Sequence, residues 1–299
     1  MRTNLSCLTV TAVAVLATLV FPYAVAAQSI WLDGQSRKNV TLEFYNPQFK
    51  GYEWGNYYWR EWRETSGLTF FLTSRFEVSE GIIFIAELPY TRARYSYGYS
   101  YHDPYWGDYE ESDESSDAAL GNPYLGVETR GKSSITFFEF GVRIPTLGEE
   151  DYEASGLGWF ADFDRLEAFT SECITIQSAG NLHLRSQEGF VGRARLGPYY
   201  WIYIGDCCGD RTELLLHYSA QVGYERRSFA LLAGFSGVMV LTEEGFLECN
   251  DTSINQLGFQ GRVNLGHFRP AVHFSIPLDD ELREIYSSVW GLSLQYQFE

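Results

Sequence analysis

Residues 68–78, LTFFLTSRFEV, and residues 82–95, IIFIAELPYTRARY, decide the fold. Both stretches alternate apolar and polar side chains with a period of two, which is typical of a β-strand with one apolar face. Only Ser79-Glu80-Gly81 separates them, so we expect a tight hairpin. In the first stretch, the polar face opposite the leucines and phenylalanines carries Thr69, Thr73, Arg75 and Glu77.

The same alternation recurs along the chain and predicts about twelve strands. Connections of two to four residues alternate with long polar connections, at roughly 49–66, 96–122, 146–172, 205–212, 242–253 and 278–286. Short periplasmic turns and long extracellular loops are typical of outer-membrane barrels. The predicted fold is therefore all-β, a transmembrane antiparallel up-and-down β-barrel. Its strands are expected at 40–48, 68–78, 82–95, 123–130, 133–145, 173–185, 190–204, 213–225, 228–241, 254–264, 268–277 and 287–298.

The first 27 residues differ from the rest of the chain. Arg2 is their only charge, an apolar stretch follows from Leu8 to Phe21, and Ala24-Val25-Ala26-Ala27 ends the segment. This order predicts a cleaved secretory signal peptide at 1–27. A permanent anchor is the alternative, but the apolar stretch is shorter than the ~18–20 residues that span a membrane. Residues 28–39 are then an N-terminal periplasmic segment or a plug, and 40–299 form the barrel.

The charge balance excludes one class of partner. Asp and Glu number 39 against 22 Lys and Arg, which gives a net charge of −17. Such a chain is repelled by phosphate backbones, so we expect no nucleic-acid partner. Aromatic residues make up 17% of the chain, which excludes a disordered protein.

If the apolar faces meet lipid, the polar faces line the lumen. Acidic residues dominate this set before residue 140 and basic residues after 180, which predicts two oppositely charged walls. The predicted pore-lining residues are Arg75, Glu77, Glu87, Glu128, Glu139, Arg143, Arg185, Arg193, Arg195, Glu225, Arg262 and Arg269.

Two features belong to the predicted loops. The stretch 95–117 carries an acidic run, for which we weigh a solvated loop against a divalent-cation site; the spacing fits no EF-hand. The cysteines of the loops lie on the oxidising side, where disulfides form. The expected bonds join Cys207 or Cys208 to Cys249 or Cys173.

The sequence gives little support for a catalytic site on the lumen wall. His183, His217 and His273 fall on the inward parity, and Ser219 and Ser275 lie near two of them. Neighbours on one face of a strand arise by chance in any barrel, and no GxSxG motif is present. We therefore expect no enzyme, no catalytic residue, no cofactor and no metal centre.

Three motifs carry a resemblance to a known family: Leu88-Pro89-Tyr90, Leu120-Gly121-Asn122 and Ile144-Pro145-Thr146. Over roughly 67–147 the chain resembles the outer-membrane family labelled "putative MetA-pathway of phenol degradation". Asn122 stands where that family often has Asp. The resemblance implies a transporter-like barrel for aromatic or other hydrophobic compounds.

The sequence thus predicts a porin-like channel of the cell outer membrane for passive transport of small, aromatic or hydrophobic solutes. Its expected partners are outer-membrane lipids and lipopolysaccharide, the outer-membrane assembly machinery and the small-molecule solute. Two alternatives stay open: a non-conducting structural or adhesive barrel that acts through acidic loops, and an outer-membrane lipid hydrolase.

Overall fold

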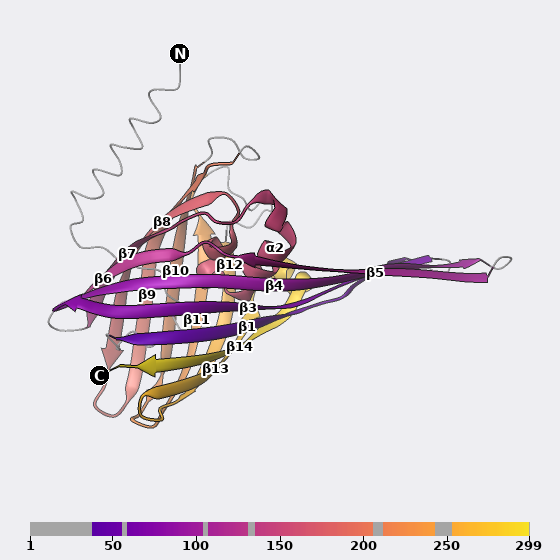
Figure 1. Ribbon diagram of the computed structural model, residues 1–299. Coiled ribbons are helices and arrows are strands. Elements are labelled where there is room, and N and C mark those ends of the chain that lie inside the picture. The colour runs from indigo at the N-terminus through magenta and orange to yellow at the C-terminus, as the bar shows by residue number, and fades with distance from the viewer. Residues whose placement is uncertain are drawn as a thin grey trace, which may run out of the picture.

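The computed structural model describes residues 38–55, 59–103, 107–130, 135–205, 212–242 and 253–298. Antiparallel strands in these ranges form one sheet that closes into a twelve-strand barrel (Figure 1). The first and last barrel strands close it, from the pair Asn39 and Gln297 onwards. The predicted fold class is confirmed. The barrel strands are β1 (Asn39–Phe49), β3 (Trp59–Ser79), β4 (Ile82–Asp103), β6 (Tyr124–Arg130), β7 (Thr136–Arg143), β8 (Cys173–Arg185), β9 (Phe190–Tyr203), β10 (Thr212–Glu225), β11 (Phe229–Val240), β12 (Ser253–Val263), β13 (Phe268–Pro277) and β14 (Tyr286–Gln297).

The short connections that the structure describes, at 80–81, 186–189, 226–228 and 264–267, lie at the end of the barrel where the described chain begins and ends (Figure 1). The predicted hairpin at 79–81 is present, because Ser79 pairs with Ile82 across a two-residue turn. Gly81 in this turn has a φ of 75°, a conformation that costs glycine little and other residues much. We call this end the turn end and the opposite one the loop end.

Two predicted loops are strands instead. Much of 49–66 and 96–122 forms β2 (Tyr52–Gly55), β5 (Gly107–Leu120) and the outer halves of β3 and β4. Together they form the protruding sheet, defined as β2, 59–67 of β3, 93–103 of β4 and 107–117 of β5, which projects far from the barrel (Figure 1). Every second residue from 95 to 101 is a tyrosine, and this period of two favours a strand although the other residues are small and polar.

A third predicted loop folds into the barrel. Within 146–172 lie η1 (Glu149–Asp151), α2 (Tyr152–Ala161) and η2 (Phe163–Phe169), and every residue of η2 is buried. We call residues 147–170 the inward segment. Another short helix, α3 (Asp280–Ile285), precedes the last strand. Within the described part of the chain, no helix is long and apolar enough to cross a membrane.

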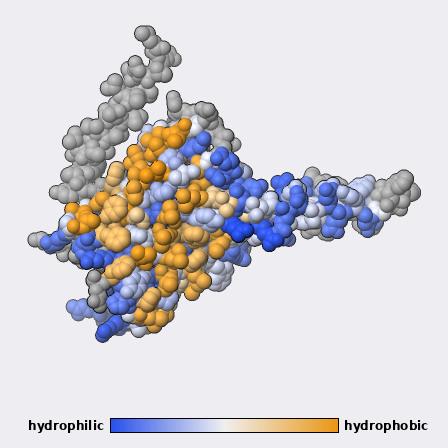
Figure 2. Space-filling view, in the orientation of Figure 1, coloured by the Kyte–Doolittle hydropathy of each residue, from blue (hydrophilic) through white to orange (hydrophobic). Residues whose placement is uncertain are grey.

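The two faces of the barrel wall differ as the alternation predicts. Outward side chains are apolar and exposed. On the side of the barrel that Figure 2 shows they form a broad hydrophobic surface, whereas the protruding sheet is mainly hydrophilic. Members of the outer apolar set include Leu68, Leu72, Phe76, Leu88, Phe138, Phe140, Leu196, Val222, Leu231, Leu292 and Leu294. Inward side chains are polar towards the turn end and largely apolar where the inward segment packs.

Several predictions fall on residues that the structure does not describe. The signal peptide at 1–27 and nearly all of the segment 28–39 lie outside the described residues. So do Cys207, Cys208 and Cys249, so the disulfide bonds stay a prediction. Cys173 begins β8 as a buried thiol with no disulfide partner among the described residues.

Candidate functional site: the barrel lumen and its inward segment

Arg165 attaches the inward segment to the barrel wall. Its Nη1 atom donates to Glu43 Oε2 of β1 and to Glu87 Oε2 of β4, both at 2.8 Å. Its Nε atom donates to Asp162 Oδ2 at 2.8 Å, within the segment itself. The side chains of Arg165, Glu43 and Glu87 are fully buried. A buried guanidinium is stable only with such close partners, so its position depends on both strands.

Arg143 of β7 extends this network. Its Nη2 atom donates to Glu87 Oε1 at 2.8 Å, and its Nε atom donates to Glu167 Oε1 of η2 at 3.0 Å. Four carboxyl groups therefore share two guanidinium groups in one buried layer. The wall holds the inward segment at two points, one through Arg165 and one through Glu167.

Asn122 joins the two ends of the inward segment. Its Oδ1 atom accepts from the backbone nitrogen of Thr146 at 2.9 Å, where the chain enters the barrel. Its Nδ2 atom donates to the carbonyls of Glu167 at 3.1 Å and Thr170 at 2.7 Å, where the chain leaves. The side chain is completely buried. One amide thus fixes the beginning and the end of the segment at the same place on the wall.

Aromatic packing fills the space around the charges. The Arg165 guanidinium lies 3.6 Å from the centroid of the Phe71 ring of β3, a cation–π contact. Phe169 packs edge-on against the same ring, with centroids 5.8 Å apart. Further along the segment, Phe160 packs against Tyr286 of β14 at 5.6 Å. The inward segment therefore closes the loop end of the lumen with a packed core.

The structure places the predicted pore-lining residues on the inner wall, at three levels of burial. Buried members are Arg75, Glu87, Glu128, Glu139, Arg143, Arg195, Glu225 and Arg262. Glu77, Arg193 and Arg269 are half-buried, and Arg185 is exposed near the turn end. Glu87 and Arg143 belong to the layer that holds the inward segment. That the other residues line a passage stays a prediction.

Several of the inward charges form close ion pairs within one half of the chain. Arg75 Nη2 and Glu128 Oε2 lie 2.6 Å apart, although both come from the first half of the chain. Arg262 Nη2 lies 2.7 Å from Glu225 Oε1, and both come from the second half. Arg195 and Glu139, at 3.8 Å, join the two halves, as do the pairs of Arg165 with Glu43 and Glu87. These ion pairs compensate individual charges of the two predicted walls, and the transverse field across the lumen stays a prediction.

Other inward polar groups have no protein partner among the described residues. Neither polar atom of Gln177 on β8 and neither of Gln221 on β10 is hydrogen-bonded there. The same holds for Nε2 of His217, whose ring stacks on Tyr199 with centroids 3.7 Å apart. Buried polar groups of native proteins are hydrogen-bonded to protein or to water. This stretch of wall can therefore hold water or a polar solute.

One inward histidine lies beside a serine of a neighbouring strand. His273 Nε2 lies 3.0 Å from the hydroxyl oxygen of Ser293 on β14, so its serine neighbour is not the predicted Ser275. The ring of Tyr45 packs on the same histidine at 5.8 Å. A nucleophile and a base need a group that orients the base and donors that stabilise an oxyanion. No group of three potential metal ligands occurs among the residues that the structure describes.

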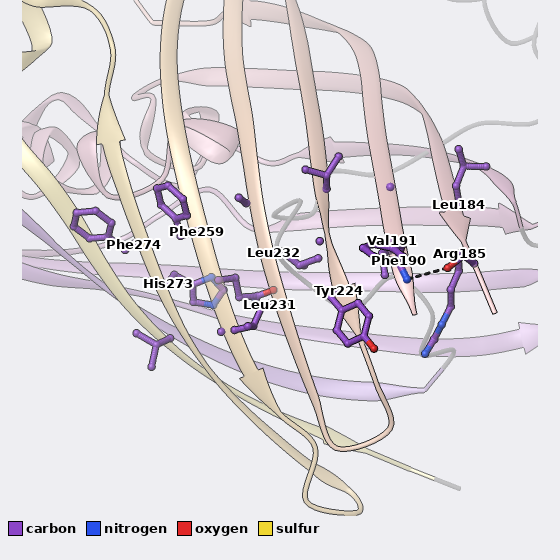
Figure 3. A pocket seen from close by; sticks show the side chains of 18 of the residues that line it. Leu184, Arg185, Phe190, Val191, Tyr224, Leu231, Leu232, Phe259, His273 and Phe274 are labelled. Carbon is purple, nitrogen blue, oxygen red and sulfur yellow. Dashed lines mark hydrogen bonds between the residues drawn. The ribbon is translucent and has the colours of Figure 1, made fainter. Parts of the chain in front are cut away.

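A separate hollow lies on the outer wall, across β8 to β13 (Figure 3). Its volume is about 1190 Å³. Exposed outward side chains such as Leu184, Val222 and Leu231 surround it. Gly192 and Gly261 also line it, and the hollow is deeper there because glycine has no side chain. The hollow belongs to the apolar outer surface rather than to the lumen.

Sequence reasoning missed the inward segment, although a signal was present. Apolar residues recur at every third position, which is close to the period of a helix and unlike a solvated loop. In the sequence, Asn122 stands out only as part of the motif Leu120-Gly121-Asn122. Its hydrogen bonds to both ends of the inward segment could not be deduced from one strand. The recurring apolar residues are Phe160, Phe163, Leu166 and Phe169.

No known protein family and no curated protein matches the sequence. Among solved structures, the COG4313 outer membrane channel from Pseudomonas putida F1 aligns with a TM-score of 0.52 and 7% identity. The alignment covers 91% of this chain and 99% of that one. The chain has the fold of an outer-membrane β-barrel. The "MetA-pathway" resemblance is not confirmed.

Two further solved barrels are similar at a lower level. The translocator domain of the autotransporter NalP from Neisseria meningitidis has a TM-score of 0.45 and 10% identity, and the alignment covers 100% of both chains. The NanC porin has a TM-score of 0.45 and 7% identity, with 87% of this chain and 100% of that one covered.

Proposed function

We propose that this barrel is a passive channel for small solutes in a bacterial outer membrane, and that the inward segment is its gate. One observation carries the proposal. Beneath the inward segment, the lumen wall presents polar groups that have no protein partner among the described residues, including Gln177 and Gln221. A barrel that served only as a scaffold would gain from an apolar or fully paired interior.

The membrane placement rests on the outer surface. Exposed apolar side chains cover the barrel, and polar ones cover the protruding sheet (Figure 2). A barrel whose backbone groups pair around the whole circumference satisfies the demands of a lipid environment. Lipid and lipopolysaccharide are then its surroundings. The last strand alternates Trp290, Leu292, Leu294 and Tyr296 outwards, which suits recognition by the outer-membrane assembly machinery.

The lining favours small, water-soluble solutes. Charged pairs and amides dominate the inner wall towards the turn end. The finer proposal of aromatic or hydrophobic cargo rests on the resemblance of residues 67–147 to the transporter-like family alone, because the polar lining does not support it. The solute is the only small-molecule partner we propose. We propose a channel rather than an enzyme, and the outer-membrane lipid hydrolase stays an open alternative.

Single-channel recording in planar bilayers tests the proposal. The wild type is expected to conduct weakly, because the inward segment closes the loop end. A variant in which a short Gly-Ser linker replaces 149–169 should conduct more strongly. The linker can be short because Asn122 contacts both ends of the segment. Folding of each variant is checked by its faster migration on gels without heating. If the folded deletion variant is silent, the barrel is a non-conducting scaffold.

A further inference from the structure

The protruding sheet stands free of the barrel. From Gly67 towards Trp59, β3 pairs with β4 and β2 and no longer with β1. The nine residues 59–67 of β3 rise ~3.3 Å each, so the protruding sheet extends roughly 30 Å beyond the barrel. The strands that cross an outer membrane need only ~9–11 residues, whereas β3 and β4 have 21 and 22. Such a projection is not needed to close a barrel.

One edge of this sheet is open. β5 ends the strand order and pairs only with β4 among the described strands. Residues 107–114 are exposed throughout, so neither face of this part of β5 is covered. Near the barrel, α2 contacts the strand through the hydrogen bond from Ala154 N to Asp117 Oδ2 at 3.1 Å. An open edge presents unpaired backbone groups to any extended chain that approaches it.

The open edge is acidic on both of its faces. Between residues 107 and 117, β5 carries six carboxylates and no basic residue. Glu111 and Asp113 lie on one face, and Glu110 and Glu114 lie on the other, because successive side chains alternate. Glu114 is ion-paired with Arg94 of β4, so the face of Glu111 and Asp113 is the more strongly acidic one. Two copies of this edge would place like charges opposite each other, so the edge disfavours pairing with itself. It is complementary to a strand with basic side chains on both faces.

Tyrosines on one face hold these carboxylates in place. The hydroxyl of Tyr99 donates to Glu111 Oε2 at 2.5 Å, and that of Tyr109 donates to the same atom at 2.6 Å. Tyr97 donates to Asp113 Oδ2 at 3.1 Å. These bonds, that from Tyr109 first, hold the pKa of Glu111 below its usual value, so this carboxylate stays charged. The rings of Tyr97, Tyr99 and Tyr109 remain about half exposed, at 49%, 45% and 53%.

We propose that the open edge of β5 binds an extended polypeptide segment rich in lysine or arginine, which adds to the sheet as a further strand. The backbone of the added strand pairs with β5, and its basic side chains meet carboxylates on both faces. On the tyrosine face they also lie over exposed rings, which attract cations. A neutral glycan would use the rings but would leave the carboxylates without a complementary charge. This function is independent of conduction through the lumen.

Fluorescence anisotropy tests the proposal with full-length protein in detergent. The probe is a labelled peptide of about ten residues that repeats Lys-Lys-Thr-Thr, which places lysines on both faces of a strand and is close in length to the acidic part 107–117 of β5. It should bind, and added salt should weaken the binding because the contacts are exposed. The matched peptide that repeats Glu-Glu-Thr-Thr should not bind. Equal binding of the two peptides, or no binding of the basic one, overturns the proposal.

Two matched variants locate the site. Glu111→Gln with Asp113→Asn removes two charges from the edge and should weaken binding at least about fivefold. Glu281→Gln with Glu284→Gln removes the same charge from the exposed helix α3 and should leave binding unchanged. Equal weakening in the two variants would show that the peptide responds only to the net charge of the chain, and the proposal would then be wrong.

N-methylated peptides distinguish strand addition from docking on a face. A methyl group on every second backbone nitrogen keeps the charge and blocks pairing along one edge of the peptide. Because an added strand pairs through alternate residues, methylation in one phase should abolish binding and in the other phase should spare it. Full binding of both methylated peptides excludes strand addition. Binding of a neutral glucan in place of the basic peptide would identify a carbohydrate surface instead.

Discussion

Arg165 on the inward segment donates to Glu87 of β4 at 2.8 Å, and the two residues are 78 positions apart in the sequence. Glu87 also accepts from Arg143 at 2.8 Å, so one carboxylate serves the wall and the segment together. This arrangement makes the closed state of the loop end depend on a few buried ion pairs. Changes to these pairs should therefore affect the segment before they affect the barrel.

Removal of the Arg165 guanidinium is expected to release the inward segment. Arg165→Met leaves Glu43, Glu87 and Asp162 buried without their shared partner, which costs about 3–5 kcal/mol. Release of the segment relieves this cost, so the variant should stay folded and conduct more than the wild type. Arg165→Lys keeps the charge, but one ammonium group cannot contact three carboxylates at once. Its conductance should therefore lie between those of the wild type and of Arg165→Met. Single-channel recording of all three proteins measures the effect.

A second change tests whether the carboxylates cause that release. Glu43→Gln with Asp162→Asn in the Arg165→Met background removes the charges left unpaired, while Glu87 keeps its pair with Arg143. This triple variant should return towards the wild-type conductance, because apolar and neutral groups can pack where charges cannot. If Arg165→Met conducts no more than the wild type while both proteins fold, Arg165 does not hold the gate.

The hydrogen bonds from Asn122 to both ends of the inward segment, called here the Asn122 clamp, give a prediction that concerns a single atom. Asn122→Asp keeps the shape and the acceptor but loses the Nδ2 donor to the carbonyls of Glu167 and Thr170. Each lost buried hydrogen bond costs about 1–3 kcal/mol. Hydrogen exchange of the backbone amides in the inward segment should become faster, while exchange in β10 and β11 stays slow. Equal exchange in the variant and the wild type would contradict the role of this clamp.

The barrel itself was predictable because each strand separates two environments. Leu68 and Leu72 face outwards and Thr69 and Thr73 face inwards, so the period of two is visible in the sequence. Short turns such as Glu80-Gly81 show, from the local sequence alone, where one strand ends and the next begins. Burial of each position therefore follows from parity alone, without knowledge of any distant contact.

The inward segment and the protruding sheet were not predictable in the same way. Glu43 and Arg165 are 122 positions apart, and nothing in either neighbourhood indicates the other. The tyrosines from 95 to 101 alternate with Ser and Gly, so the stretch is polar enough to be interpreted as a loop. Its strand character depends on pairing with β3 and β5 on both sides.

Close packing at Gly141 predicts a loss of stability from one added methyl group. A Cβ atom there would lie 2.2 Å from the hydroxyl oxygen of Tyr124, whose ring covers the inward face of this glycine. Gly141→Ala should lower the free energy of unfolding by about 1–3 kcal/mol. Gly180→Ala is the matched control, because its Cβ would lie 3.5 Å from Phe138, an ordinary contact. Urea unfolding in detergent measures both variants.

A companion change identifies the cause of that loss. Tyr124→Leu shortens the side chain, so Gly141→Ala should be less harmful in that background. Non-additive effects of this kind are expected for residues in contact. If the two changes in the free energy of unfolding simply add, the clash with Tyr124 does not explain the loss of stability.

The outer surface gives the last prediction. Phe140 lies in the middle of β7 and is 40% exposed on the outer face, while its neighbour Glu139 is buried on the inner face. An arginine that faces lipid near the midplane of the bilayer costs about 2–4 kcal/mol, so Phe140→Arg should lower stability by that amount. Tyr152→Arg is the control, because Tyr152 is 80% exposed on α2 at the loop end, away from the apolar surface. Unfolding from lipid vesicles, followed by tryptophan fluorescence, measures both substitutions. Equal tolerance at the two positions would place Phe140 in water, and the proposed position of the barrel in the membrane would then be wrong.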